Sequence, residues 1–303
     1  MPGLVLLVPG GTGQLGRDLV ALSGGDVEVR APGSAELDLT QAGAVVEAIA
    51  TIAKYARESG KRPVVVNAAA YTAVDAAESE EERAFALNVD GPRVLAAACS
   101  SRNVPLVHVS TDYVFAGDAD RPYEPEDALA PRTAYGRTKA AGEDAVLGSG
   151  ARAWIVRTAW LYGMGGGNFV KTMARLEQER ETVSVVDDQH GSPTWSADLA
   201  SGLLELATRI VSDEAPEHKV LHGAGGGETT WHGFAKAIFT ELGADPERVL
   251  PCASAEFPGP APRPAYSVLS DASWRAAGLT PLRPWEEALH EFMTVNAGSL
   301  RTG

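Results

Sequence analysis

A glycine-rich turn near the start of the chain constrains its fold more than any other feature. The apolar run 4–8 is followed at once by glycines at three-residue intervals and then by an amphipathic segment. The first glycine would permit a tight turn, the second would let a pyrophosphate approach the backbone, and the third would let a helix pack on the strand. N–H groups at a helix start bind phosphate. The alternative is a plain strand-to-helix turn. We predict a dinucleotide-binding unit with contacts from Gly10, Gly13, Gln14, Leu15 and Gly16.

Apolar runs and helical patterns alternate over the first two-thirds of the chain. The runs lack the polar–apolar alternation of half-buried strands, which is typical of parallel strands covered by helices on both faces. We therefore predict an α/β fold, a Rossmann-type doubly wound parallel sheet with a smaller C-terminal substrate-binding domain. Strands are expected at 4–8, 27–30, 64–67, 106–110 and 153–157, and helices at 41–58 and 81–101.

The regular alternation of apolar runs and helical patterns ends after about residue 160. Residues 163–167 are glycine-rich, and 251–264 contain five prolines, which predicts a segment without regular structure. The Rossmann domain is predicted to comprise residues 1–160 with a returning segment at about 186–222. The substrate-binding domain would comprise about 161–185 and 223–303.

Composition narrows the classes of partner. With 26 basic and 40 acidic residues the net charge is −14, which opposes binding to nucleic acid or to an anionic membrane. The two cysteines lie far apart without metal-ligand spacing, so we predict structural thiols and no metal. The first apolar run lacks a basic flank and is too short for a signal peptide or a membrane span. The chain is therefore expected to be cytoplasmic.

The end of the second predicted strand bears on the choice of cofactor. An acidic residue there would bind the ribose hydroxyls of NADH, whereas this strand ends in Arg30, with Glu28 two residues before it. A guanidinium can pair with a 2′-phosphate. We predict NADPH as cofactor and keep NADH as the alternative, because a solvated arginine at a strand end is common.

A tyrosine and a lysine four residues apart suggest the chemistry. On a helix, Tyr135 and Lys139 would share one face. An ammonium group beside a phenol is expected to lower the pKa of the phenol, which could then protonate a ketone oxygen as hydride arrives at carbon. Thr111 follows an apolar strand, where ligands bind in open α/β sheets, and could hydrogen-bond the same oxygen.

These motifs together resemble an extended short-chain dehydrogenase/reductase. The resemblance rests on the glycine turn, Asn67-Ala68-Ala69-Ala70, the S-T-D-Y-V-F segment at 110–115 and Y-x-x-x-K. Within that superfamily the chain is most similar to the dTDP-4-dehydrorhamnose reductase family, nearly from end to end. The segment 157–163 matches the R-T-x-W-x-Y-G of that family, and 167–169, 188–194 and 263–269 match as well.

The resemblance implies NAD(P)H-dependent reduction of the C4 keto group of dTDP-4-dehydro-6-deoxy-L-mannose to dTDP-L-rhamnose, by a protein that can form a homodimer. It implies Thr111, Tyr135 and Lys139 as catalytic residues, and Asn88 as a brace for the site. Further cofactor contacts would come from Asp38, Leu39, Ala68, Ala69 and Ala70, besides Tyr135 and Lys139. The substrate contacts would be Val74, Thr111, Asp112, Tyr113, Trp160, Asn168, Phe169 and Arg263, with Lys171 and Arg175 as further candidates for the diphosphate.

Two other functions stay open at this point. Nucleotide-sugar epimerases and dehydratases share the Tyr–Lys pair but keep their nicotinamide. Dehydration is disfavoured because Tyr113 stands where a second carboxylate would be needed. A non-catalytic regulatory subunit of methionine adenosyltransferase also resembles this family, although an intact Thr–Tyr–Lys set argues against loss of catalysis. The sequence does not decide which deoxysugar is bound.

Overall fold

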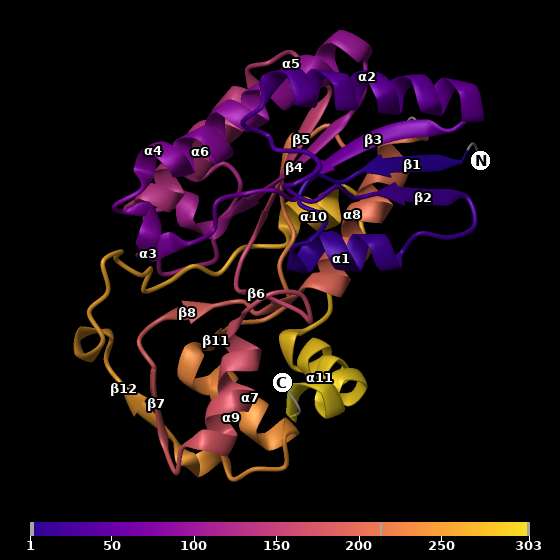
Figure 1. Ribbon diagram of the computed structural model, residues 1–303. Coiled ribbons are helices and arrows are strands. Elements are labelled where there is room, and N and C mark those ends of the chain that lie inside the picture. The colour runs from indigo at the N-terminus through magenta and orange to yellow at the C-terminus, as the bar shows by residue number, and fades with distance from the viewer. Residues whose placement is uncertain (1–2, 213, 302–303) are drawn as a thin grey trace.

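A parallel sheet forms the centre of the molecule, which is a computed structural model that describes residues 3–212 and 214–301. Its six strands lie in the order β10-β5-β4-β3-β1-β2, all parallel (Figure 1). The chain moves outward from β1 to β2 and then returns to the other side of β1 with β3, so the switch point lies between β1 and β3. The predicted doubly wound fold is confirmed. The strands are β1 (Leu4–Leu7), β2 (Val27–Arg30), β3 (Arg62–Asn67), β4 (Leu106–Thr111), β5 (Ala153–Thr158) and β10 (Val220–His222).

Helices cover both faces of this sheet, as the continuous apolar runs require. Alternate strand residues such as Leu4 and Leu6 belong to one buried cluster, and Val5 and Leu7 belong to another. The first cluster lies under α1 (Gln14–Ala21), α8 (Ser196–Val211) and α10 (Ala272–Ala276). The second lies under α2 (Ala42–Ser59), α5 (Gly91–Arg102) and α6 (Ala134–Leu147). Burial on both faces is what fixes the register of such strands.

Several short elements interrupt the predicted pattern. The helix expected at 81–101 is divided into α4 (Glu81–Phe85), a π-helical turn η1 (Ala86–Asp90) and α5. A short helix α3 (Val74–Ala77) precedes them, and a 3₁₀ turn η2 (Asp112–Val114) directly follows β4. These irregular turns all lie beside the carboxyl ends of β3 and β4, where the polar residues of the site are found.

A smaller part lies below the sheet in Figure 1 and has its own apolar cluster. Its helices are α7 (Phe169–Glu179), α9 (Trp231–Glu241) and α11 (Trp285–Arg301). Three two-stranded pairs lie outside the central sheet: β6 (Leu161–Tyr162) with β9 (Thr194–Trp195), β7 (Val183–Val186) with β12 (Val249–Cys252), and β8 (His190–Gly191) with β11 (Thr229–Thr230). The pair of β7 and β12 belongs to the smaller part, since Val183, Val185 and Val249 lie in its apolar cluster. Two 3₁₀ turns, η3 (Pro246–Arg248) and η4 (Ser254–Glu256), flank β12.

The prediction that 251–264 lacks regular structure was wrong at its beginning. Pro251 lies within β12, opposite Val185 of β7, and η4 follows at once. A proline has no N–H to donate, but this sheet has only two strands, so each has a free edge. The proline is therefore tolerated there, as it would not be in a central strand.

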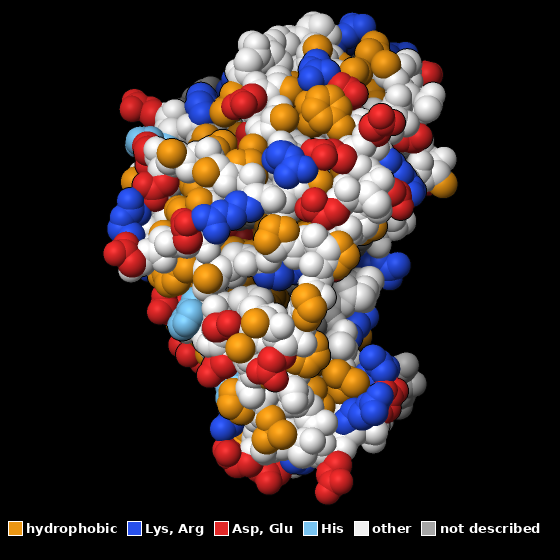
Figure 2. Space-filling view, turned by 90° about the vertical axis from the view of Figure 1, so that its left-hand side faces the viewer, with side chains coloured by type: hydrophobic (Ala, Val, Ile, Leu, Met, Phe, Trp, Pro, Cys, Tyr) orange, Lys and Arg blue, Asp and Glu red, His pale blue; other side chains and the backbone are white. Residues whose placement is uncertain are grey.

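The surface carries both signs of charge despite the acidic excess. Figure 2 shows acidic and basic side chains interspersed over one face, with no broad basic area on it. Among the described residues, no helix combines the length and the apolar character needed to cross a membrane.

Candidate active site

A cleft of about 1160 Å³ opens at the carboxyl ends of the parallel strands and extends to the start of α9. It is lined by the glycine turn, by residues at the ends of β3 and β4, and by Trp160 and Trp231. Seventeen of the predicted site residues line this one cleft: Gly10, Gly13, Gln14, Leu15, Gly16, Asp38, Leu39, Ala68, Ala69, Ala70, Val74, Thr111, Asp112, Tyr113, Tyr135, Lys139 and Trp160.

The glycine turn has the geometry of a phosphate cradle. Gly10 has φ +86°, in the left-handed region that favours glycine. A Cβ at this position would lie 2.7 Å from the backbone nitrogen of Ala69, so the turn lies directly against the end of β3. Helix α1 begins after Gly13 without a side-chain cap, which leaves its first N–H groups available to a ligand. The residues present therefore fit the pyrophosphate of a dinucleotide.

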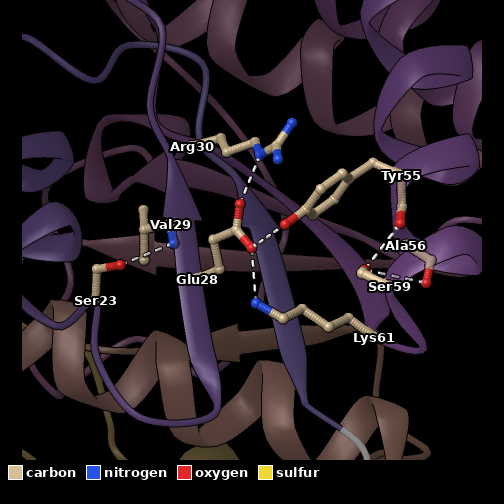
Figure 3. Close-up of polar contacts among 8 residues, drawn as sticks. All are labelled: Ser23, Glu28, Val29, Arg30, Tyr55, Ala56, Ser59 and Lys61. Atoms are coloured by element: carbon tan, nitrogen blue, oxygen red, sulfur yellow. Dashed lines mark hydrogen bonds and ion pairs between the residues drawn. The ribbon is translucent and has the colours of Figure 1, made fainter.

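Arg30, the last residue of β2, lies outside the lining of the cleft. Its Nε donates to Glu28 at 2.8 Å, and its guanidinium carbon lies 3.6 Å from the centre of the Tyr55 ring (Figure 3). Glu28 also accepts from the Tyr55 hydroxyl at 2.6 Å and from Lys61 at 2.7 Å. These bonds, that of Lys61 first, lower the pKa of Glu28 to about 2. The sequence analysis did not anticipate that Tyr55 and Lys61 would hold this pair.

Thr111 ends β4 with its hydroxyl in a defined direction. The hydroxyl donates to Asp112 at 2.8 Å and accepts from the N–H of Tyr113 at 3.3 Å, which caps η2. Asp112 is 4% exposed. Burial raises the pKa of Asp112 to about 6, although hydrogen bonds from Ser267 and Thr111 lower it in part.

Tyr135 lies in the first turn of α6, which polar caps hold in place. The Thr133 hydroxyl accepts from the N–H of Gly136 at 2.9 Å, and Glu78 accepts from the N–H of Ala134 at 2.8 Å. Gly136 lets the helix touch η2, because a Cβ there would lie 2.2 Å from the carbonyl oxygen of Tyr113. The Tyr135 ring meets that of Tyr113 edge to face, with centroids 5.6 Å apart.

The expected lowering of the Tyr135 pKa was wrong for the protein alone. Burial raises the pKa of Tyr135, and the neighbouring Thr111 hydroxyl only partly offsets this effect. The reason is the cost of burying a phenolate without solvent. The ammonium group of Lys139 donates to the carbonyl oxygen of Val109 at 2.7 Å. Burial lowers the pKa of Lys139 to about 8, although the charge of Glu143 opposes this shift.

Asn88 and the two tryptophans complete the surroundings. Asn88, on η1, binds the backbone N–H and C=O of Tyr71 and the hydroxyl of Thr138 at 2.8, 3.1 and 3.0 Å. Trp160 has φ +46° and stacks on Trp231, with ring centroids 3.5 Å apart and an interplanar angle of 8°. Trp231 was missed in the sequence, because only tertiary structure brings the first residue of α9 to the end of β5.

Three further predicted substrate residues do not line the cleft. Asn168 donates to Gln14 at 2.8 Å and lines a neighbouring hollow, and Phe169 packs on Trp231 with centroids 4.5 Å apart. Arg263 donates to Asp75 at 2.7 Å and to the carbonyl oxygen of Ala261 at 3.0 Å. Lys171 and Arg175 line a separate hollow of about 460 Å³. Within residues 3–212 and 214–301, no group of three metal-binding side chains of His, Cys, Asp or Glu lies together.

Comparisons with known proteins agree with this arrangement. The chain is 50% identical over 288 residues to the dTDP-4-dehydrorhamnose reductase of Streptomyces griseus, covering 94% of this chain and 91% of that protein. It is 46% identical over 288 residues to a probable dTDP-4,6-dihydroxy-2-methyloxan-3-one 4-ketoreductase of Streptomyces antibioticus, with coverage of 94% and 93%.

Solved structures and a family model add to this agreement. The dTDP-4-dehydrorhamnose reductase of Bacillus anthracis in complex with NADP has a TM-score of 0.87 and 36% identity, covering 97% of this chain and all of that one. A family model described as the RmlD substrate binding domain matches residues 4–297. The chain therefore belongs to the RmlD family, as the resemblance implied.

Proposed function

We propose that the chain is an NADPH-dependent reductase that converts the C4 keto group of dTDP-4-dehydro-6-deoxy-L-mannose into the hydroxyl group of dTDP-L-rhamnose. One observation carries this proposal: Thr111, Tyr135 and Lys139 line the same cleft as the glycine turn. The names of the relatives support reduction of a keto group on a dTDP sugar, and the NADP complex of a structural neighbour supports the cofactor. The same names favour a reductase over an epimerase or a regulatory subunit.

The cofactor would lie along the glycine turn, with its adenosine near Asp38 and Leu39 and its nicotinamide near Ala68–Ala70, Tyr135 and Lys139. When bound, NADPH supplies a hydride to the carbonyl carbon. Tyr135 gives its proton to the carbonyl oxygen, so one hydride and one proton convert the ketone into an alcohol. The Thr111 hydroxyl holds that oxygen, and the Lys139 ammonium stabilises the phenolate left behind.

The sugar nucleotide would occupy the other end of the cleft. Val74, Asp112, Tyr113 and Trp160 line this end, and the flat face of Trp160 suits the apolar side of a 6-deoxysugar. Asn168 and Phe169 support this wall from behind, and Arg263 would reach the diphosphate by exchanging its partner Asp75. We also propose the division into a Rossmann domain and a substrate-binding domain given above, a homodimer, and a cytoplasmic location, in line with the family resemblance.

The test is turnover with the keto sugar nucleotide, followed by the absorbance of the reduced nicotinamide. Tyr135→Phe should lower kcat about 10²- to 10⁴-fold, because the proton donor is lost while binding surfaces remain. The matched control is Tyr162→Phe, which removes a buried hydroxyl that lies outside the cleft lining and has no hydrogen-bond partner among residues 3–212 and 214–301. Full turnover by Tyr135→Phe would refute the role of this tyrosine, and product formation without net consumption of NADPH would indicate an epimerase.

A further inference from the structure

A chain of buried polar side chains runs from the sheet to Lys139. Asn67 ends β3, His108 lies on β4, and Lys139 lies on α6, and each of the three is at most 1% exposed. The Asn67 amide nitrogen lies 3.0 Å from His108 Nδ1, and His108 Nε2 lies 3.3 Å from Lys139 Nζ. The proposed reaction uses Lys139 but assigns nothing to the other two.

Backbone geometry fixes the direction of the Asn67 amide. The N–H of Ala69 donates to Asn67 Oδ1 at 3.1 Å, so the NH₂ group of the same amide must face His108. His108 Nδ1 therefore accepts a hydrogen bond. Complete burial and the neighbouring Lys139 lower the pKa of His108 well below its usual value, so the imidazole is neutral and carries one proton. That proton is on Nε2, the nitrogen that faces Lys139.

The proton on His108 Nε2 affects whether Lys139 is charged or neutral. The ammonium form of Lys139 has only hydrogen-bond donors, so it cannot accept from the imidazole N–H. The neutral amine form has a lone pair, which can accept a hydrogen bond from that N–H. We propose that Asn67 and His108 are positioning residues that govern the protonation of Lys139, with the N–H of Ala69 as the fixed end of the chain. The inference rests on the proposed function, because it concerns a group of that reaction.

The other charges around Lys139 do not cancel this effect. On its own helix, Glu143 favours the ammonium form, but Arg157 of β5 binds both oxygens of Glu143 at 2.7–3.2 Å. Tyr135 is a neutral phenol, and Asp112, beyond β4, is bound to the Thr111 hydroxyl. Lys139 can therefore lose its proton near pH 8, and the rate of reduction is expected to fall above that pH, since the ammonium no longer stabilises the phenolate.

The substitution Asn67→Asp tests the row of hydrogen bonds from Asn67 through His108 to Lys139, because aspartate has almost the same shape as asparagine. A carboxylate would still accept from Ala69, but it would also require a proton on His108 Nδ1, so Nε2 would accept from the Lys139 ammonium. At pH 9 the native enzyme should keep about a tenth of its maximal kcat, and Asn67→Asp half or more of its own. His108→Leu removes the N–H that faces Lys139 without adding charge. It should also move the fall in rate at high pH, the alkaline limb of the pH profile, to higher pH.

A control and a direct measurement keep the inference distinct from the proposed function. His222→Leu makes the same change at a buried histidine of β10 that lies outside the cleft lining, and should leave the fall in rate at high pH in place. The ¹⁵N chemical shifts of the His108 ring separate the two tautomers in the native protein without substrate or turnover. A proton on Nδ1 in that spectrum would overturn the inference, as would an unshifted alkaline limb in both Asn67→Asp and His108→Leu.

Discussion

Tyr135 can donate a proton only while its phenol is protonated, and burial in the first turn of α6 secures this. The sequence suggested that Lys139 would lower the pKa of the phenol, but the cost of burying a phenolate outweighs this effect in the protein alone. For reduction this is the favourable state. The lysine contributes later, when the proton has moved to the substrate and a phenolate remains in the cleft.

Arg30 is the residue on which we expect a preference for NADPH to depend. Its Nε donates to Glu28, and its terminal nitrogens would pair with the oxygens of a 2′-phosphate. Arg30→Ala should raise the KM for NADPH about tenfold or more and change the KM for NADH less than twofold, in turnover with each cofactor. Lys61→Ala is the matched control, because it removes the other cation on Glu28. Equal losses with both cofactors would show that Arg30 does not contact the phosphate.

Asp112 should reduce stability at neutral pH because its charge is buried. Its folded-state pKa is about 6 and its ordinary value is 3.8, so the folded chain binds more protons between these values. Stability therefore falls as pH rises through this window. Asp112→Asn should raise the free energy of unfolding by about 1–3 kcal/mol at pH 8 and leave it unchanged at pH 4, measured by urea denaturation.

The control is Asp127, whose pKa shift is opposite in direction to that of Asp112. Bonds from Arg121 and from the N–H of Glu124 lower the pKa of Asp127 to about 2, so its stabilising effect is present at neutral pH and is lost as pH falls toward that value. Asp127→Asn should therefore destabilise the protein at pH 8. A loss of stability at pH 8 in both variants would contradict the account of Asp112.

At the scale of elements, the larger part of the fold could be predicted and the smaller part could not. The five predicted strands end within two residues of those observed, because runs such as Val64–Asn67 are buried on both faces. Thr111, Tyr135 and Lys139 could be found because strand-end and helical spacing are local features. Trp231, Tyr55 and His108 could not, since only tertiary packing gives them their neighbours.

The π-helical turn η1 is the element that the periodic pattern concealed. It presents Asn88 to three partners on two other segments, and such turns are frequent at functional sites. Asn88→Ala should lower the free energy of unfolding by about 1–3 kcal/mol, since it removes the side-chain bonds to the half-buried backbone of Tyr71 and to the buried Thr138 hydroxyl. It should also lower kcat, because Thr138 precedes Lys139. Denaturation and turnover measure these effects.

A second asparagine separates this effect from a general loss of helix stability. Asn296, on α11, donates to the carbonyl oxygen of Phe292 in its own helix. Asn296→Ala should cost less than about 1 kcal/mol and leave kcat unchanged. If Asn88→Ala costs no more than this control, η1 does not brace the site.

For the whole molecule, the cleft is the place where the two parts meet. Trp160 comes from the end of β5 in the larger part, and Trp231 begins α9 in the smaller part. A tryptophan at φ +46° costs of order 1–3 kcal/mol, and such strain persists where the surroundings hold it. The stack with Trp231 is one of the contacts that do so, and it forms the end wall of the cleft.

This arrangement predicts a separation between the two ligands. Trp231→Ala removes an aromatic face that would contact the sugar, so the KM for the sugar nucleotide should rise about tenfold. The KM for NADPH should change less than twofold, because the glycine turn and the ends of β3 and β4 are left intact. Trp195→Ala is the matched control, since Trp195 packs on Phe292 outside the cleft lining. Both variants should lose stability, but only Trp231→Ala should lose affinity for the sugar nucleotide. An equal KM for the sugar nucleotide in the two variants would mean that the stack holds the two parts together without forming part of the substrate site.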